Sequence, residues 1–243
     1  MIRIPILRPG SDEAFPPVEA ALHEPNGLLA AGGDLRPARL LQAYAHGIFP
    51  WFSPGEPILW WSPDPRMVFP TGAMHVPRRL ARWLRGCDWH IRADTDFAGV
   101  VHACAAPRAG QSGTWITPDM RAAYTKLHEL GHAHSVEVYA ENDCVGGIYG
   151  VAIGRMFYGE SMFSRASNAS KVALLALACR LHDWGWPLVD AQVTSEHLQT
   201  LGAVALPRAD FCRRITGLVT QPGRTGSWHA EFENLRPASL ATR

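Results

Sequence analysis

The sequence predicts an α+β protein, with a small N-terminal domain at residues 1–70 and a larger domain at residues 71–243 in which helices flank a mostly antiparallel sheet. Three observations support this class. The chain has 243 residues, of which 47% are apolar, so it can bury a substantial core. The N-terminal part is rich in proline, glycine and aromatic residues. The remainder alternates between helical and strand patterns.

One helix is expected in the N-terminal domain, over residues 35–46. We expect Asp34 to cap its start, and Pro37 suits the first turn because a proline there loses no helical hydrogen bond. Gly47 provides the stop signal.

Three further helices are expected in the first part of the larger domain. They span residues 78–85, about 96–105 and 117–131. The third begins at Thr117-Pro118, a capping residue followed by proline, and Gly131 ends it.

An antiparallel meander of three strands follows. The strands span residues 135–140, 144–153 and about 155–160. Turn-forming residues separate them. Gly146, Gly147 and Gly150 weaken the middle strand, but they allow a bulge or the close approach of another group.

The last part of the chain alternates helices with strands. In order, we expect a helix from Asn168 to about Trp184, a strand over residues 188–193, a short helix over 195–201, a strand around Val204 and a helix over about 209–218. Together with the meander, these elements predict a layered domain.

Composition narrows the functional classes. A formal net charge of +1 means that any polyanion must be held by a local patch. The five cysteines are odd in number, widely spaced and without a C-x-x-C pair, which argues against a disulfide framework and a zinc knuckle. We find no signal-peptide pattern and no apolar run long enough to span a membrane, so we expect a cytoplasmic protein with buried thiols.

The segment 188–193 carries the most informative polar pair. Alternation in a strand would place Asp190 and Gln192 on one face and Val189, Ala191 and Val193 on the other. We expect the Gln192 amide to donate to the Asp190 carboxylate and to present its carbonyl oxygen to a nucleophile such as an amine. The alternative is a polar pair on a solvent-facing strand.

Residues 159–164 (GESMFS) lie between a strand and a helix. They do not form a nucleophile elbow, because Phe163 stands where G-x-S-x-G needs its second glycine. Glu160 is either a surface carboxylate or an anion that holds a cationic group of a substrate, and its position in the sequence favours neither.

Residues 128–132 (HELGH) match the H-E-x-x-H zinc pattern. That pattern needs both histidines on one face of an uninterrupted helix. Because Gly131 is expected to end the helix, His132 would lie beyond it, and we expect no metal site.

A basic stripe lies on the helix expected at 78–85. Four arginines without an acidic neighbour form either a solvated face or a phosphate-binding edge: Arg78, Arg79, Arg82 and Arg85. The tryptophans at 51, 60, 61 and 115 are typical core residues, although one or two suit stacking against an unpaired base.

Eight ordered motifs resemble those of the leucyl/phenylalanyl-tRNA-protein transferase family. They are GLLAAGGD at 27–34, GIFPWF at 47–52, WWSPDPR at 60–66, TWIT at 114–117, LHELGHAH at 127–134, GGIYG at 146–150, GESMFS at 159–164 and DAQ at 190–192. The resemblance runs from about residue 20 to residue 215 and includes the zinc-like string, which in this family is not a metal site.

The resemblance implies a small N-terminal domain and a GNAT-like (acetyltransferase-type) C-terminal domain. It implies transfer of leucine or phenylalanine from aminoacyl-tRNA to the N-terminal Arg or Lys of an acceptor protein, which marks that protein for degradation through the N-degron pathway. The expected partners are the 3′ aminoacyl-adenosine end of the tRNA and the acceptor protein, with no membrane. Because the ester is already activated, no cofactor is implied.

The same resemblance assigns site residues. It implies that Asp190 and Gln192 are catalytic and that Glu160 lies near the positive charge of the acceptor. The aminoacyl-adenosine end would contact Trp51, Trp115 and Tyr124. The apolar pocket for the transferred side chain would consist of Ile148, Met162, Leu174 and Val189. The tRNA-binding cluster would be Arg78, Arg79, Arg82 and Arg85.

Ile148 stands where the family commonly has Met, which leaves the preference between leucine and phenylalanine open. Two other functions remain as alternatives. An acetyl-CoA-dependent N-acetyltransferase would need a glycine-rich pyrophosphate loop, and residues 164–170 contain no glycine. A non-catalytic RNA-binding module would explain the arginines and tryptophans but would leave Asp190, Gln192 and Glu160 without a role.

Overall fold

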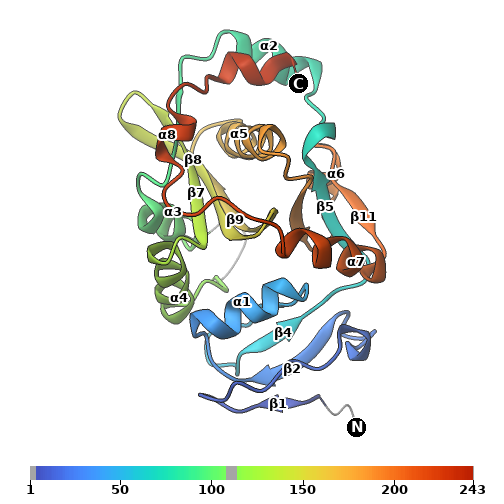
Figure 1. Ribbon diagram of the computed structural model, residues 1–243. Coiled ribbons are helices and arrows are strands. Elements are labelled where there is room, and N and C mark those ends of the chain that lie inside the picture. Colours follow the sequence, from blue (N-terminus) through green and yellow to red (C-terminus); the bar gives the residue numbers. More distant parts are fainter. Residues whose placement is uncertain (1–3, 108–113, 243) are drawn as a thin grey trace.

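The computed structural model describes residues 4–107 and 114–242 and forms two β-sheets surrounded by helices (Figure 1). The smaller sheet has the order β1-β2-β4-β3 and consists of β1 (Ile6–Leu7), β2 (Leu28–Gly32), β3 (Phe49–Pro50) and β4 (Leu59–Trp61). Helix α1 (Pro37–Ala45) covers it, and the 3-10 turn η1 (Val18–Ala20) precedes β2. The mixed α+β class is confirmed.

The larger sheet has the order β11-β5-β10-β9-β8-β7-β6. Its strands are β5 (Arg66–Pro70), β6 (His90–Ala93), β7 (Ala133–Ala140), β8 (Asp143–Ile153), β9 (Met156–Ser164), β10 (Leu188–Gln192) and β11 (Val204–Leu206). Neighbouring strands pair antiparallel except for β9 and β10, which run parallel. The expected, mostly antiparallel sheet is therefore present.

The helices of the larger layer follow the sequence pattern closely. They are α2 (Arg78–Arg85), α3 (Phe97–Cys104), α4 (Pro118–Glu129), α5 (Ala169–Asp183), α6 (Glu196–Gln199), α7 (Arg208–Val219) and α8 (His229–Phe232), with the 3-10 turns η2 (Thr71–Ala73) and η3 (Pro237–Thr242). Thr117 caps α4 by accepting from the Met120 amide, as expected. In α1, by contrast, Arg36 and not Asp34 is the N-cap, because Pro37 begins the helix two residues later than an Asp34 cap requires.

Two core clusters lie on opposite faces of the larger sheet. Along β8, Tyr149 and Val151 pack into the cluster that includes α1, α3, α4 and α7, whereas Ile148 and Ala152 pack into the cluster around α5. This alternation is the period of two that predicted the strand. The β8 glycines serve the packing of the protein itself, since a Cβ at Gly150 would lie 2.1 Å from the Tyr158 carbonyl oxygen.

Several short elements have no clear sequence signal. The sequence analysis missed β1 to β6. Five of these strands are short, proline-containing or irregular. Strand β5 is buried on both faces, so polar and apolar residues do not alternate in it.

Two expected boundaries also differ. Strand β9 continues to Ser164 and does not end near Glu160. Because β5 pairs with β10 and β11, the segment just before residue 70 belongs to the larger sheet.

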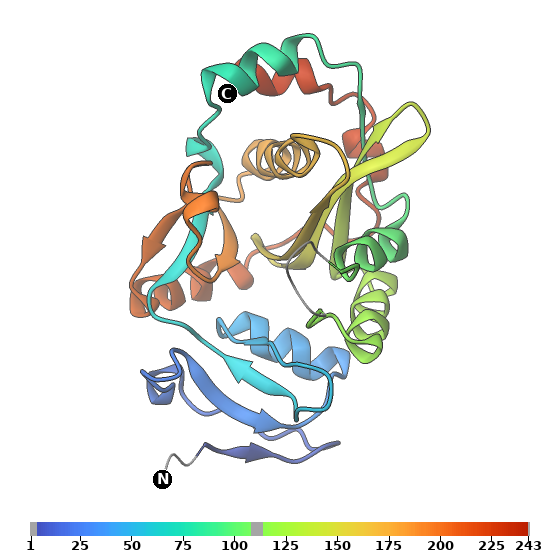
Figure 2. The same ribbon diagram turned by 180° about the vertical axis from the view of Figure 1, so that it is seen from behind.

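In both views, α2 and η3 lie at the opposite end of the molecule from the N-terminal sheet, with α5 between them (Figure 1 and Figure 2). Within the ranges 4–107 and 114–242, no helix has both the length and the apolar character that crossing a membrane requires.

Candidate active site

A cavity of about 300 Å³ opens where the parallel strands β9 and β10 separate. The two strands pair at Phe157–Val189 and Tyr158–Asp190, and the residues of β9 that line the cavity begin directly after these pairs, at Gly159. The lining residues are Phe49, Pro50, Trp51, Phe69, Trp115, Ile148, Gly159, Glu160, Ser161, Met162, Leu174, Val189, Asp190, Ala191, Gln192, Val193 and Leu198. The pocket therefore combines residues from both sheets, α5, α6 and the segment before α4.

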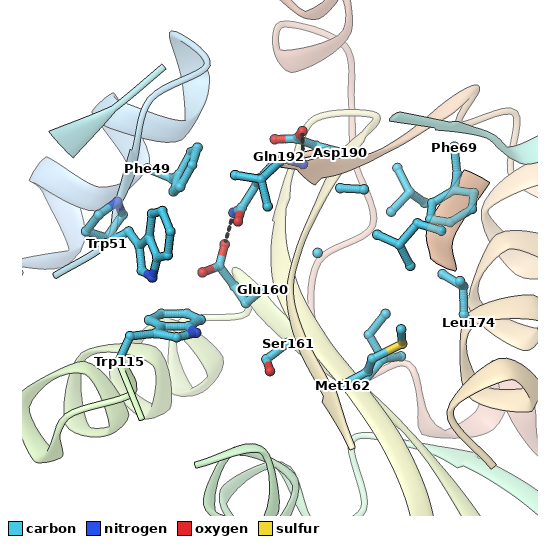
Figure 3. Close-up of a pocket in the computed structure, with 17 residues that line it drawn as sticks. Phe49, Trp51, Phe69, Trp115, Glu160, Ser161, Met162, Leu174, Asp190 and Gln192 are labelled. Carbon is cyan, nitrogen blue, oxygen red and sulfur yellow. Dashed lines mark hydrogen bonds between the residues drawn. The ribbon is translucent and has the colours of Figure 1, made fainter. Parts of the chain in front are cut away.

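The pocket has an apolar end and an aromatic end, with polar groups between them. Figure 3 shows Phe69, Met162 and Leu174 on one side, and Phe49, Trp51 and Trp115 on the other, with Glu160 and Gln192 in the middle. Such a division suits a ligand that has an apolar group, a reacting polar centre and a planar ring system.

The apolar end contains the residues expected for a side-chain pocket, and the structure brings all four together: Ile148, Met162, Leu174 and Val189. Phe69 from β5 and Leu198 from α6 complete the wall. Sequence analysis missed these two because β5 was not expected as a strand and α6 is only one turn long.

The aromatic end is open to solvent. Trp51 follows β3 and is 43% exposed, and its ring lies 5.7 Å from that of Trp61. The Trp61 indole N–H donates to the Trp51 backbone carbonyl at 2.6 Å, which fixes the backbone beneath the exposed ring. An exposed, anchored indole can stack with a planar ligand without a large loss of conformational entropy.

Asp190 is fully buried and paired with Arg66 from β5. The guanidinium donates to both carboxylate oxygens, at 2.8 and 2.6 Å, and to the Gly47 carbonyl at 2.9 Å. It also lies between the rings of Phe49 and Phe211, 4.8 and 4.7 Å from their centroids. Asp190 lines the pocket, but both of its carboxylate oxygens are bonded to Arg66 inside the protein.

The expected contact between the side chains of Asp190 and Gln192 is wrong. A bulge interrupts the pairing of β10 with β5 at Ala191, and Gln192 adopts a φ of +63°, so simple alternation ends after Asp190. The Asp190 carboxylate accepts from the Gln192 backbone amide at 2.9 Å. Asp190 therefore holds the backbone of the bulge, and the Gln192 side chain turns away from it into the pocket.

The partner of the Gln192 side chain is Glu160. The Gln192 amide nitrogen donates to Glu160 Oε1 at 2.8 Å, across the opening between β10 and β9 (Figure 3). Since the nitrogen is engaged, the amide carbonyl oxygen is the group of Gln192 left to accept from a ligand. Glu160, and not Asp190, therefore holds the Gln192 side chain, and the presentation of its carbonyl oxygen to a nucleophile stays a prediction.

Glu160 accepts from two tyrosine hydroxyls as well. Tyr44 from α1 donates to Oε1 at 2.7 Å, and Tyr124 from α4 donates to Oε2 at 2.6 Å. Tyr124, expected to hold the aminoacyl-adenosine end, does not line the pocket but supports Glu160 from behind. Tyr44, to which the sequence analysis assigned no functional role, supports Glu160 in the same way.

The environment of Glu160 raises its pKa to about 7. Burial is the main cause and the negative charge of Asp190 adds to it, while the hydrogen bonds from Tyr124, Tyr44 and Gln192 act in the opposite direction. Burial and the Glu160 charge in turn raise the pKa values of Tyr44 and Tyr124 well above their usual range, so both remain donors at neutral pH.

The four arginines of the basic stripe lie outside the pocket. They are exposed on α2, which packs against η3 at the far end of the molecule from the N-terminal sheet: Arg78, Arg79, Arg82 and Arg85 (Figure 2). None of the four lines the pocket that contains Glu160.

The zinc-like string has a structural role. Helix α4 ends at Glu129 and Gly131 has a φ of +76°, so His132 lies beyond the helix as expected. The His128 ring stacks on Phe97 at 4.3 Å and contacts the Ala133 carbonyl. Among the described residues, no group of three or more His, Cys, Asp and Glu side chains is placed to hold a metal ion.

The family profiles and the relatives that match this chain carry the same family name. The family profile of leucyl/phenylalanyl-tRNA protein transferase matches residues 68–216, and that of its N-terminal domain matches residues 33–64. The leucyl/phenylalanyl-tRNA-protein transferase of Xanthomonas campestris pv. campestris (strain B100) is 58% identical over 237 residues, covering 97% of this chain and 95% of the relative. The enzyme of the same name from Xanthomonas axonopodis pv. citri (strain 306) is 61% identical over 226 residues, covering 93% and 90%.

Likeness to solved structures is weak. A GCN5-related N-acetyltransferase-like protein from Streptococcus suis aligns with a TM-score of 0.29 and 12% identity, covering 67% of this chain and 61% of that chain. A match at this level carries no argument about the fold.

Proposed function

The chain belongs to the leucyl/phenylalanyl-tRNA protein transferase family of aminoacyltransferases, and we propose that it moves leucine or phenylalanine from aminoacyl-tRNA to the N-terminal Arg or Lys of an acceptor protein. This proposal depends mainly on one observation, the order of the chemical groups that line the pocket. An apolar end, the Glu160–Gln192 pair and an exposed indole follow one another there. An aminoacyl-adenosine has its side chain, ester and base in the same order.

Roles for the pocket residues follow from this order. The side chain of leucine or phenylalanine enters between Ile148, Met162, Leu174 and Val189. The adenine base stacks on Trp51 or Trp115, because an unpaired base is commonly held against an aromatic face. The ester then lies beside Glu160 and Gln192, and the Glu160 carboxylate can attract the positive charge of an arriving Arg or Lys.

The reaction is aminolysis of an ester, in which positioning supplies much of the rate. An α-amine has an ordinary pKa of about 7.7–8.0, so a useful fraction is neutral at cellular pH. The Gln192 carbonyl accepts a hydrogen bond from this amine and orients it toward the ester carbon. Asp190 and Arg66 act indirectly, because they hold the bulge from which Gln192 projects.

The remaining assignments are part of the same proposal. The arginines of α2 contact tRNA phosphates, the larger layer is a GNAT-like transfer domain, and the enzyme works in the cytoplasm, where the acceptor is marked for degradation. We propose two domains, as predicted (1–70 and 71–243), but with the boundary moved a few residues earlier, because β5 pairs within the larger sheet. The two family profiles meet between residues 64 and 68, which favours a boundary a few residues earlier, before β5.

The test is a transfer assay with leucyl-tRNA that carries labelled leucine and two peptides that differ only in an initial Arg or Glu. Label should appear on the Arg peptide alone, without CoA or added metal. Isoleucyl-tRNA serves as the matched donor control. The pocket should disfavour a β-branched side chain through crowding near Cβ, although a difference of one methylene permits only about 1–3 kcal/mol of discrimination. Equal labelling of both peptides would contradict the proposed acceptor specificity.

A further inference from the structure

Three side chains from three different elements form a closed ring of oxygen contacts beside the pocket. Tyr44 Oη lies 2.7 Å from Tyr124 Oη and 2.7 Å from Glu160 Oε1. Tyr124 Oη lies 2.6 Å from Glu160 Oε2. All three separations are those of O–H···O hydrogen bonds.

The number of protons in this ring decides its state. Three hydrogen bonds need three protons, and the two tyrosine hydroxyls supply only two. The third can come only from the carboxyl of Glu160. A neutral Glu160 completes the ring, whereas an ionised Glu160 leaves one oxygen–oxygen contact without a hydrogen. The ring is therefore built to take up and release one proton.

We propose that Glu160 is the group that accepts the proton from the α-amine during aminoacyl transfer, and that Tyr44 and Tyr124 are positioning residues that hold its carboxyl for this exchange. This inference rests on the proposed function. It assigns to Glu160 a chemical role in addition to the attraction of a cationic acceptor.

The other polar groups of the pocket are poor proton acceptors. Both carboxylate oxygens of Asp190 are bonded to Arg66, and the side chain is fully buried. An amide such as Gln192 does not titrate near neutral pH, so it can orient the amine but cannot keep its proton. Glu160 lines the cavity and is bonded to Gln192, which places it next to the amine that Gln192 orients.

The acidity of Glu160 suits this exchange. Burial raises its pKa to about 7, close to the pH at which the enzyme works. A general base is most effective when its pKa lies near the working pH, because it is then both ionised and basic enough.

The proposed step is balanced. The neutral amine nitrogen forms a bond to the ester carbonyl carbon, and the bond from that carbon to the ribose oxygen breaks. One proton leaves the nitrogen for the Glu160 carboxylate and completes the ring. The same carboxyl then gives a proton to the departing ribose oxygen, which becomes a hydroxyl, and the ring returns to its ionised state.

The test is the pH dependence of kcat/KM for an Arg-initiated peptide, measured with leucyl-tRNA for the wild-type enzyme and for Glu160→Gln. At acid pH, the logarithm of the wild-type rate should rise with a slope of about two, because both the acceptor amine and Glu160 must lose a proton. Glu160→Gln keeps the shape of the side chain. Its rate should fall by about 10²–10⁴-fold and its slope to about one.

Two conservative variants test the ring and a third is the control. Tyr44→Phe and Tyr124→Phe each remove a donor that lowers the pKa of Glu160, so the Glu160 limb of the profile should move to higher pH. Tyr158→Phe removes a buried hydroxyl, on the same strand as Glu160, that has no hydrogen-bond partner among the residues that the structure describes, and it should leave the profile unchanged. Thermal unfolding of each variant shows that it is folded.

The possible results separate the two proposals. If Glu160→Gln keeps a slope of about two, or changes only the KM for the acceptor, Glu160 binds substrate and the proton-acceptor role is wrong. If Tyr44→Phe and Tyr124→Phe do not shift the part of the pH profile assigned to Glu160, the ring does not determine the pKa of Glu160. If the wild-type enzyme labels no peptide with leucine, the proposed function fails and this inference fails with it.

Discussion

At the scale of the residue, the burial of the Glu160 carboxyl lowers the free energy of unfolding at neutral pH. Its folded pKa of about 7 lies above the ordinary value of 4.5, so the folded state holds this proton more tightly than the unfolded state. The associated stability is complete below about pH 4.5 and is lost as the pH rises through 7. Functional placement of Glu160 therefore weakens the fold at neutral pH.

A first prediction concerns the stability of Glu160→Gln. Because Gln has no charge to bury, the wild type should lose stability relative to the variant by no more than about 3 kcal/mol between pH 5 and pH 8. Urea unfolding of both proteins at the two pH values measures this. A difference that does not depend on pH would mean that Glu160 titrates normally in the folded enzyme.

A second prediction concerns the buried pair of Asp190 and Arg66. Asp190→Asn leaves the Arg66 guanidinium buried without its counter-charge, and such a loss typically costs about 3–5 kcal/mol. We expect a lower free energy of unfolding and slower transfer, because the bulge that carries Gln192 loses its anchor. Denaturant unfolding and the transfer assay measure the two effects. Arg214→Ala, at an exposed position on α7, is the control for loss of a charge. Unchanged stability of Asp190→Asn would contradict the structural role given to the pair.

At the scale of the element, the separation of β9 from β10 creates the pocket. Parallel neighbours would normally continue their ladder, but the bulge at Ala191 and the positive φ of Gln192 turn β10 away. The second irregularity is in the pairing of β9 with β8, where Gly150 pairs with Gly159 and Tyr149 pairs with Ser161, so Glu160 is the unpaired residue of that bulge. Two interruptions of regular pairing thus determine the direction of the Gln192 and Glu160 side chains.

A third prediction tests the packing of β8 against β9. In Gly150→Ala the new Cβ meets the Tyr158 carbonyl and the Phe157 ring, at 2.1 and 2.6 Å, so we expect a loss of at least about 1–3 kcal/mol and slower transfer. Gly217→Ala in α7 meets nothing within 4 Å and should stabilise the protein by up to about 1 kcal/mol. Thermal unfolding of the two variants provides the comparison. A neutral Gly150→Ala would mean that the strands adjust without moving Glu160.

At the scale of the whole molecule, the pocket and the basic helix are separate surfaces. The pocket is lined by residues of β3 in the N-terminal sheet and by Leu174 of α5. Helix α2 lies on the side of α5 away from the N-terminal sheet (Figure 1). A tRNA that places its 3′ end in the pocket extends well beyond it. Under the proposed function, recognition of the aminoacyl end and of the phosphate backbone would therefore belong to different elements.

A fourth prediction follows for tRNA binding. Replacing Arg82 and Arg85 by Ala should weaken tRNA binding and reduce the dependence of log affinity on log salt by about 0.7–0.9 for each phosphate that is no longer neutralised. Transfer from leucyl-adenosine, which lacks the tRNA body, should be unchanged. Filter binding over a salt series and the transfer assay with both donors measure these effects, and Arg214→Ala is again the charge control. If the transfer rate fell equally with leucyl-tRNA and leucyl-adenosine, the two substitutions would act on the transfer domain itself and not on tRNA binding.

The sequence by itself determined most of the regular elements and most of the pocket. Periodicity and capping residues predicted α2 to α5 and the meander of β7 to β9, because these signals are local in the chain. Of the ten residues predicted to be catalytic or to bind substrate, nine line one cavity, and Tyr124 lies directly behind it.

Only the tertiary structure decided which polar groups are partners. Arg66 bonds Asp190 across 124 positions, Tyr44 bonds Glu160 across 116, and Gln192 bonds Glu160 across 32. A local sequence pattern cannot predict such pairs. Alternation in a strand predicted Asp190, and not Glu160, as the partner of the Gln192 amide. The bulge overrides that alternation because a buried carboxylate gains more from a guanidinium and a backbone amide than from a side-chain amide.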